Sequence, residues 1–239
     1  MALESSSSLL PPHVVITGAA GALGRAVVQR FLDDGARLAL IGHSDAQLAD
    51  AFTGLANSHH LLIGADVRSE VGMKAAAQQI LQVLKHVDTV VHLAGGFEMG
   101  AAVHELDRAG WDRMMDLNAW SFVAVQQAFA PSMVERKSGS VIAVTAKVAT
   151  RGMAAMSAYI ASKSALQRLV EAAAAEMSPH GVRVNSIAPS VLDTPANRQA
   201  MPDANPADWV STDVAAQTVA FLASPAAQAL HGQHLALGA

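Results

Sequence analysis

Short apolar runs rich in β-branched residues alternate with longer segments of helical periodicity along most of the chain. Gly, Pro, Asp or Ser bounds each apolar run, as is usual for buried strands. The runs predict strands at His13–Thr17, Arg37–Ile41, His60–Ile63, Thr89–Leu93, Ser140–Thr145, Val182–Ile187 and His234–Leu237. The segments between them predict helices near 22–34, 45–56, 69–86, 105–136, 157–178 and 211–223.

This alternation predicts an α/β fold with a doubly wound, Rossmann-like parallel sheet of about seven strands and helices on both faces. A length of 239 residues suits one or two domains. Because the chain shows no linker and no internal repeat, we expect a single domain over residues 13–239. Residues 1–12, rich in serine and ending in two prolines, are expected to form a flexible N-terminal tail.

Composition excludes several classes of function. The chain has no cysteine, which excludes disulfides, thiolate metal sites and cysteine nucleophiles, and which fits a reducing, cytoplasmic location. A net charge of −4 without a basic run argues against nucleic acid or an anionic membrane as a partner. No run reaches the ~18 apolar residues that a transmembrane helix needs, and the first residues lack the features of a signal peptide.

Three glycines follow the first predicted strand, at the point where a helix is expected to begin. They are Gly18, Gly21 and Gly24. One such glycine permits a tight turn, one lets the backbone approach a pyrophosphate, and one lets the helix pack closely on the strand. An ordinary glycine-rich turn is the alternative interpretation, but the position between the first strand and the first helix favours a dinucleotide site.

The end of the second predicted strand bears on which dinucleotide is bound. Folds of this kind that prefer NAD usually place an acid there, which bonds the ribose hydroxyls. Gly42 occupies that place, so a 2′-phosphate would meet no repelling carboxylate, and His43 or Ser44 would help to hold it. The sequence therefore predicts NADP(H) or NAD(H) as the cofactor and favours NADP(H). A plain turn glycine with little selectivity is the alternative.

The strongest chemical signal is the pair Tyr159 and Lys163 in a predicted helix. Their i, i+4 spacing puts both side chains on one helix face. An ammonium close to the phenol would stabilise the phenolate and lower the pKa of the tyrosine, which suits a general acid for a carbonyl or imine. A half-buried tyrosine beside a solvated lysine is the alternative, and the glycine turn upstream argues against it.

Together these motifs resemble the short-chain dehydrogenase/reductase family, in its single-domain branch, and the resemblance covers the chain from His13 onward. The matching segments are Thr17–Gly24, Asp66-Val67, Leu93–Gly96, Asn118, Tyr159 with Lys163, Arg183–Asn185, Pro189–Thr194 and Gly232-Gln233. The resemblance implies a dinucleotide-binding catalytic domain. It also implies an NAD(P)(H)-dependent oxidoreductase that transfers hydride between the nicotinamide and a small carbonyl, alcohol or imine-like substrate.

The same resemblance assigns roles to individual residues. Tyr159 is implied to be the general acid and base, Lys163 to bind the nicotinamide ribose and lower the pKa of the phenol, and Asn118 to position a relay water. Asp66 is implied to bond the adenine. The residues expected to bind the cofactor are Gly18, Gly21, Leu23, Gly24, His43, Asp66, Val67, Ala94, Gly95, Gly96, Lys163, Pro189 and Thr194.

The chain departs from the family pattern at three places. Ala146 stands where the family has its catalytic serine, and the adjacent Thr145 would point to the opposite face of the strand. His92 replaces an asparagine at the end of the fourth predicted strand. Ser190 replaces the glycine that usually follows Pro189.

Part of this departure locally resembles dihydropteridine reductase, through Ala146-Lys147, the turn Ala94–Phe97 and the segment Leu192–Pro202. Such an enzyme reduces a quinonoid pterin, whose reacting centre needs little help from a serine hydroxyl. That branch has an acid at the place of Gly42 and a tryptophan at the place of Phe97, so pterin reduction is one alternative function. A catalytically weak NAD(P)-binding sensor or scaffold is another.

The remaining signals concern metals and partners. The histidines show no metal-ligand spacing, so we expect no metal site. His92 would either touch cofactor or substrate or simply pack in the core. The helices near 105–136 and 157–178 carry small residues that permit close helix approach, and they predict a homodimer or homotetramer. Packing within one chain is the alternative.

Overall fold

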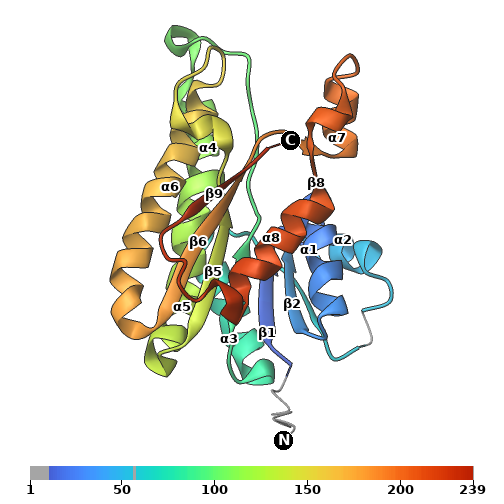
Figure 1. The fold of residues 1–239 in the computed structure, drawn as a ribbon, viewed down its shortest axis with the longest axis vertical. Helices are drawn as coiled ribbons and strands as arrows, with labels where there is room; N and C mark the ends of the chain where they lie inside the picture. Colours follow the sequence, from blue (N-terminus) through green and yellow to red (C-terminus); the bar gives the residue numbers. More distant parts are fainter. Residues whose placement is uncertain (1–10, 56–57, 239) are drawn as a thin grey trace, which may run out of the picture.

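The computed structural model describes residues 11–55 and 58–238 and contains a seven-stranded parallel sheet (Figure 1). The strands lie in the order β3-β2-β1-β4-β5-β6-β9. They are β1 His13–Thr17, β2 Arg37–Gly42, β3 Leu61–Gly64, β4 Thr89–His92, β5 Gly139–Val144, β6 Val182–Pro189 and β9 His234–Leu237. The predicted doubly wound α/β fold is confirmed.

The helices connect these strands. They are α1 Ala22–Asp33, α2 Asp45–Ala51, α3 Glu70–Leu84, α4 Arg108–Met115, α5 Ser121–Arg136, α6 Ser157–Met177, α7 Pro195–Ala200 and α8 Thr212–Ala223. A separate pair of short strands, β7 Leu192–Asp193 and β8 Val210–Ser211, brackets α7. Within the described ranges, no helix has the length and apolar character needed to cross a lipid bilayer.

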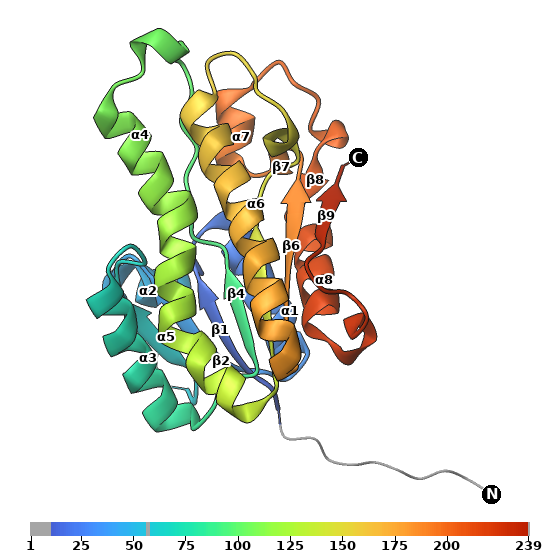
Figure 2. The ribbon, with the colours of Figure 1, turned by 90° about the vertical axis from the view of Figure 1, so that its left-hand side faces the viewer.

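Apolar residues of the strands alternate between two cores, because successive side chains of a strand point to opposite faces. In β1, Val15 packs in the core beneath α3, α5 and α6, whereas Val14 and Ile16 pack in the core beneath α1 and α8. Figures 1 and 2 show these two helical layers on opposite sides of the sheet. Burial on both faces explains why the strands read as nearly continuous apolar runs.

The segment 105–136 is not one continuous helix, in contrast to the prediction. α4 begins after Asp107, whose carboxylate accepts a hydrogen bond from the Gly110 amide at 2.6 Å. Between α4 and α5, the residues Asp116–Trp120 form a π-helical turn, a feature that often accompanies functional sites. Asn118 lies in this turn and is fully buried.

The predicted tail lies almost wholly outside the described residues. Of residues 1–12, only Pro11 and Pro12 are described. The Pro12 carbonyl accepts a hydrogen bond from the Arg37 amide at 2.9 Å. Pro12 therefore belongs to the fold, because this bond continues the pairing of β1 with β2.

Candidate active site

The carboxyl ends of β1 to β4 open into a cleft of about 440 Å³. The strand order reverses here, because β2 and β3 lie on one side of β1 and β4 lies on the other. In open α/β sheets such a switch point is where ligands bind. The cleft is lined by Gly18, Ala20, Gly21, Ile41, Gly42, His43, Gln47, Ala65, Asp66, Val67, Arg68, Leu93, Ala94, Gly95 and Leu117.

The glycine turn lies against the loop that follows β4. Gly18 has a φ of +67°, and a Cβ there would lie 2.8 Å from the amide nitrogen of Ala94. A Cβ at Gly24 would lie 2.3 Å from the carbonyl oxygen of Gly18, so α1 packs directly on the turn. Gly21 lines the cleft and precedes the first residue of α1. A helix N-terminus at a cleft suits the binding of phosphate groups.

At the end of β2, a side chain in place of Gly42 would press against α2. A Cβ at Gly42 would lie 2.9 Å from the side chain of Leu48, which is fully buried in α2. Asp45, the next acid along the chain, accepts a hydrogen bond from the last amide of β3. His43 lines the cleft, whereas the Ser44 hydroxyl accepts a hydrogen bond from α2 and caps that helix.

Asp66, predicted to bond the adenine, shares its carboxylate with Arg68. The Arg68 guanidinium donates to the two carboxylate oxygens at 2.9 Å, from Nε to one and from Nη2 to the other. These hydrogen bonds lower the pKa of Asp66, so the carboxylate keeps its charge. Both side chains are nearly half exposed, which weakens the ion pair through solvent screening. No motif in the sequence singles out Arg68, although an acid and an arginine stand two residues apart there.

Asn118 ties the turn after β4 to α6. Its Oδ1 accepts a hydrogen bond from the Gly96 amide at 2.9 Å, and its Nδ2 donates to the Gly96 carbonyl and to Ser162 Oγ, both at 3.0 Å. Nδ2 is thereby saturated, while Oδ1 keeps one lone pair. A Cβ at Gly95 would lie 2.9 Å from this Oδ1 and 3.1 Å from Lys163 Nζ. The cleft, Asn118 and Lys163 therefore meet at Gly95.

Tyr159 and Lys163 lie one turn apart on α6. Lys163 is buried, and its Nζ donates to the Val144 carbonyl at the end of β5, at 2.9 Å. The Tyr159 ring meets Phe97 edge-on, with ring centroids 4.9 Å apart. Burial raises the pKa of Tyr159 to about 12 and lowers the pKa of Lys163 to about 8. The expected lowering of the pKa of the phenol is not what the structure shows, because burial dominates and the ammonium bonds a carbonyl.

The place of the family's serine carries no hydroxyl. Ala146 is buried there. The neighbouring Thr145 is also buried, and its hydroxyl donates to the Ile187 carbonyl on β6 at 3.1 Å and lies 3.3 Å from Ser186 Oγ. Because the Thr145 hydroxyl bonds to β6, it does not replace the missing serine.

His92 joins three segments around the site. Its Nδ1 lies 2.9 Å from Thr17 Oγ1, and its Nε2 lies 3.1 Å from Ser121 Oγ. Because the Ser121 hydroxyl donates to the Leu117 carbonyl at 2.7 Å, it accepts from His92, which assigns the ring proton to Nε2. Burial, followed by the charge of Lys163, lowers the pKa of His92 to about 3, so the ring is neutral. Of the two interpretations of His92, the structure favours the packed histidine.

The structure brings only part of the predicted cofactor set to the cleft. The members that line it are Gly18, Gly21, His43, Asp66, Val67, Ala94 and Gly95. Leu23 is buried in the core beneath α1, and Pro189 lies buried at the end of β6. Thr194 caps α7, because its hydroxyl accepts a hydrogen bond from the amide of Asn197 at 3.2 Å. Lining residues that the sequence analysis did not name as cofactor residues include Ala20, Gln47 and Arg68.

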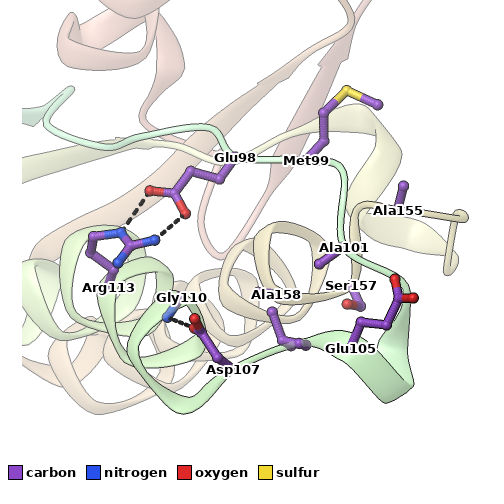
Figure 3. Close-up of a pocket in the computed structure, with 11 residues that line it drawn as sticks. Glu98, Met99, Ala101, Glu105, Asp107, Gly110, Arg113, Ala155, Ser157 and Ala158 are labelled. Atoms are coloured by element: carbon purple, nitrogen blue, oxygen red, sulfur yellow. Dashed lines mark hydrogen bonds and ion pairs between the residues drawn. The ribbon is translucent and has the colours of Figure 1, made fainter.

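A second pocket, of about 180 Å³, lies beside the start of α6 (Figure 3). The Glu98 carboxylate accepts two hydrogen bonds of 2.8 Å from Arg113, which tie the loop after β4 to α4. The Gly100 amide donates to the Ala155 carbonyl at 2.8 Å, which ties the same loop to the segment before α6. These two connections hold the loop that carries Phe97 against α4 and against the segment before α6.

Comparison with known proteins identifies the family. The family model described as short chain dehydrogenase matches residues 12–205. Galactitol 2-dehydrogenase of Rhizobium johnstonii is 30% identical over 247 aligned residues, which cover 97% of this chain and 95% of that protein. Both findings agree with the glycine turn and the Tyr159–Lys163 pair.

Solved structures share the fold. The crystal structure of levodione reductase matches with a TM-score of 0.86 at 25% identity and covers 95% of this chain and 96% of that chain. The 3-ketoacyl-(acyl-carrier-protein) reductase of Brucella melitensis, solved with NADH, matches with a TM-score of 0.84 at 23% identity, with 95% and 96% of the two chains covered. The chain therefore belongs to the short-chain dehydrogenase family and is an NAD(P)-dependent oxidoreductase of that family.

Proposed function

We propose that the protein transfers hydride between bound NADP(H) or NAD(H) and a small carbonyl, alcohol or imine-like substrate, with Tyr159 moving the proton. The observation that carries this proposal is the convergence at Gly95, which lines the cleft and lies against both Lys163 and Asn118. Hydride transfer to a carbonyl or imine carbon needs a proton donor beside the reacting atoms. Tyr159 lies in the same helix, one turn before Lys163.

The cleft fits a dinucleotide. At Gly18 and Gly95 the space that a Cβ would fill is already occupied by neighbouring atoms, so the main chain itself forms a surface that a flat, extended ligand can approach. We assign the pyrophosphate to the first amides of α1, the adenine side to Asp66 and Val67, and the nicotinamide ribose to Lys163. When bound, the dinucleotide supplies or accepts the hydride, while residues of the chain orient the reactants and move the proton.

Several features of the cleft support NADP(H) over NAD(H). Residue 42 is a glycine, so no carboxylate there opposes a 2′-phosphate, and a Cβ added there would press on the side chain of Leu48. His43 and Arg68 line the same part of the cleft and offer hydrogen-bond donors. An arginine suits a phosphate well, because its guanidinium can donate two parallel hydrogen bonds.

Tyr159 is suited to donate a proton in the direction of reduction. With a pKa of about 12, the phenol keeps its proton at neutral pH. The charge of Lys163, one helical turn away, stabilises the phenolate that forms when the proton leaves. A water on the remaining lone pair of Asn118 Oδ1 would return a proton to the tyrosine.

The substrate side of the site favours conjugated, flat molecules. Ala146 offers no hydroxyl to polarise a carbonyl, so the reacting group needs to be electrophilic by itself. The Phe97 ring, exposed and edge-on to Tyr159, adds an aromatic surface beside the proton donor. A quinonoid pterin is one substrate of this kind, and it is the specific alternative that these two residues support.

Loss of reduced-nicotinamide absorbance, followed with NADPH and with NADH against ketones, enones and a quinonoid pterin, tests the proposal. Tyr159→Phe is expected to lower kcat by about 10²–10⁴-fold and to leave the Kd of the dinucleotide within about twofold. Ser157→Ala is the control on the same helix, because its buried hydroxyl has no hydrogen-bond partner among the described residues. Unchanged turnover in Tyr159→Phe would refute the role of the phenol.

A dinucleotide-binding sensor with little turnover is the alternative function, and the alanine at position 146 supports it. The phenol of Tyr159, one helical turn from Lys163, opposes it, because a protein that only binds the dinucleotide needs no proton donor. If both dinucleotides bind tightly while every substrate of the panel is left unreduced, the sensor explanation is the better one.

We also propose a homodimer or homotetramer assembled through α5 and α6. The two helices lie on the same side of the sheet (Figure 2). Trp120, 40% exposed just before α5, and the exposed alanines of α6 form an outward face that a second copy can approach closely. Sedimentation velocity is expected to give the mass of two or four chains, and Trp120→Glu to shift it towards one.

A further inference from the structure

We propose that His13, His86 and Asp88 bind a divalent transition-metal ion of the zinc type, at the edge of the sheet opposite the cleft. Among the residues that the structure describes, one ligand atom from each of these side chains lies within 4.8 Å of the other two. His13 opens β1, whereas His86 and Asp88 precede β4. Because β1 and β4 pair in parallel, the site lies at the amino ends of the two strands whose carboxyl ends flank the cleft.

Existing interactions already hold the side chains of His13, His86 and Asp88 together at the amino ends of β1 and β4. Asp88 Oδ2 accepts a hydrogen bond from the main-chain amide of His13 at 2.9 Å and lies 3.4 Å from His86 Nε2. His13 Nδ1 lies 3.1 Å from the His86 carbonyl, and the two imidazole rings lie against each other, tilted by 38°, with centroids 4.4 Å apart. A metal ion would therefore order side chains that have lost much of their conformational freedom.

The ligand set determines which ions fit. Two imidazoles and one carboxylate suit Zn²⁺, Co²⁺ and Ni²⁺, and a water can take a fourth position. Zinc with bonds of about 2.0–2.2 Å needs ligand atoms roughly 3.5 Å apart, so the side chains have to close by about 1 Å. All three are only partly buried, so their rings and carboxylate can make this movement.

Arg136 limits the affinity of the site. Its guanidinium donates to Asp88 Oδ1 at 3.1 Å and to the Val87 carbonyl at 3.1 Å. The two oxygens of Asp88 thus face different partners, with Oδ1 towards the arginine and Oδ2 towards the histidines. Because a nearby positive charge repels a metal cation, we expect weaker binding than in a structural zinc site.

The chain contains an internal comparison for this proposal. The rings of His59 and His60 also lie against each other, tilted by 38°, with centroids 4.1 Å apart. Over residues 11–55 and 58–238, no third histidine or acid completes a three-ligand group with them. A metal that binds any pair of surface histidines would bind both pairs, whereas the proposed site also requires Asp88.

Titration of the full, untagged chain with ZnCl₂ after dialysis against EDTA tests the proposal. Calorimetry is expected to give one Zn²⁺ per chain, and CoCl₂ to give a visible d–d absorption band. His86→Gln should weaken Zn²⁺ binding by more than the roughly 10- to 100-fold cost of losing an outer partner. His59→Gln should bind Zn²⁺ as the unmodified chain does.

Stability gives an independent readout. Zn²⁺ is expected to raise the unfolding temperature of the unmodified chain and of His59→Gln, but not that of His86→Gln or Asp88→Asn. The His86 side chain is 39% exposed, so the chain should tolerate its replacement. Absence of stoichiometric binding, or equal losses in His86→Gln and His59→Gln, would overturn the proposal.

Discussion

The two sides of the cleft are built from different parts of the chain. The side formed by β1 and α1 is mostly main chain, and at Gly18 and Gly24 it leaves no space for a Cβ. The side towards α6 and the π-helical turn, which the cleft reaches at Gly95, depends on the side chains of Lys163 and Asn118, with Tyr159 one helical turn before Lys163. The main-chain side is therefore disrupted by adding atoms, and the side-chain side by removing them. Substitutions on the main-chain side are therefore expected to change the affinity for the dinucleotide, and substitutions on the side-chain side to change turnover.

Gly18→Ala is expected to have the largest effect, because it adds an atom to the main-chain side. The new Cβ would sit at a φ of +67°, 2.8 Å from the backbone of the loop after β4, so the cleft has to deform. We expect the Kd of the dinucleotide, measured by titration, to rise about 100-fold or more, which corresponds to about 2.7 kcal/mol.

Gly35→Ala is the matched control for this prediction. Gly35 has a φ of +75°, but nothing among the described residues lies within 4 Å of a Cβ there. The variant should lose about 1–2 kcal/mol of unfolding free energy from backbone strain and keep its affinity for the dinucleotide. Equal Kd values for Gly18→Ala and Gly35→Ala would show that the affinity for the dinucleotide does not depend on the close main-chain contact at Gly18.

His92→Ala is expected to affect both sides, because the ring bonds Thr17 on one side and Ser121 on the other. Two buried hydroxyls lose a partner, at about 1–3 kcal/mol each, and a cavity opens. Urea denaturation should show a loss of about 3–4 kcal/mol in unfolding free energy, together with a higher Kd and a lower kcat. A variant in which only Kd changes would show that His92 serves the main-chain side alone.

Lys163 predicts how turnover depends on pH. Burial lowers its pKa to about 8, so the ammonium loses its proton as the pH rises through that value, and the phenolate then loses its stabilising charge. Tyr159, with a pKa of about 12, remains protonated over this range. For the reduction, kcat/KM should be constant below about pH 7 and fall about tenfold by roughly pH 9. A plateau that extends to about pH 10 would contradict this assignment.

Arg68→Ala is expected to have the smallest effect, and only on the choice of cofactor. Loss of the guanidinium should lower kcat/KM with NADPH by about five- to tenfold and leave the value with NADH within about twofold, because only NADPH carries the 2′-phosphate. Arg37→Ala is the control, since Arg37 bonds the His59 carbonyl and does not line the cleft. Equal losses with both dinucleotides would show that Arg68 acts only by orienting Asp66.

The sheet could be predicted because its strands are buried on both faces and bounded by turn residues. Each of the seven strands of the main sheet begins and ends within two residues of its predicted bounds. The segment Asp116–Trp120 could not be predicted, because a single π-helical turn hardly changes the periodicity of a long amphipathic stretch. The short elements between Leu192 and Ser211 were missed for lack of any period to detect.

Local spacing identified part of the site, and tertiary contacts determined the rest. The pair Tyr159 and Lys163 was visible as an i, i+4 motif. The pKa of Tyr159 was expected to fall, but it rises because the phenol is buried, and burial is a property of the folded chain. His13 and His86 are 73 positions apart in the sequence, and they lie close together only because β1 pairs with β4.

The side chain of Leu48 has a consequence for the evolution of cofactor choice. An acid at position 42 by itself would collide with Leu48, while a smaller residue at position 48 by itself would leave a hole in a fully buried position, at a cost of about 2–5 kcal/mol. A carboxylate at position 42 therefore requires the side chain of Leu48 to move, and a smaller residue at position 48 would make room for it. The two positions are thus coupled, because the effect of an acid at position 42 depends on which residue stands at position 48.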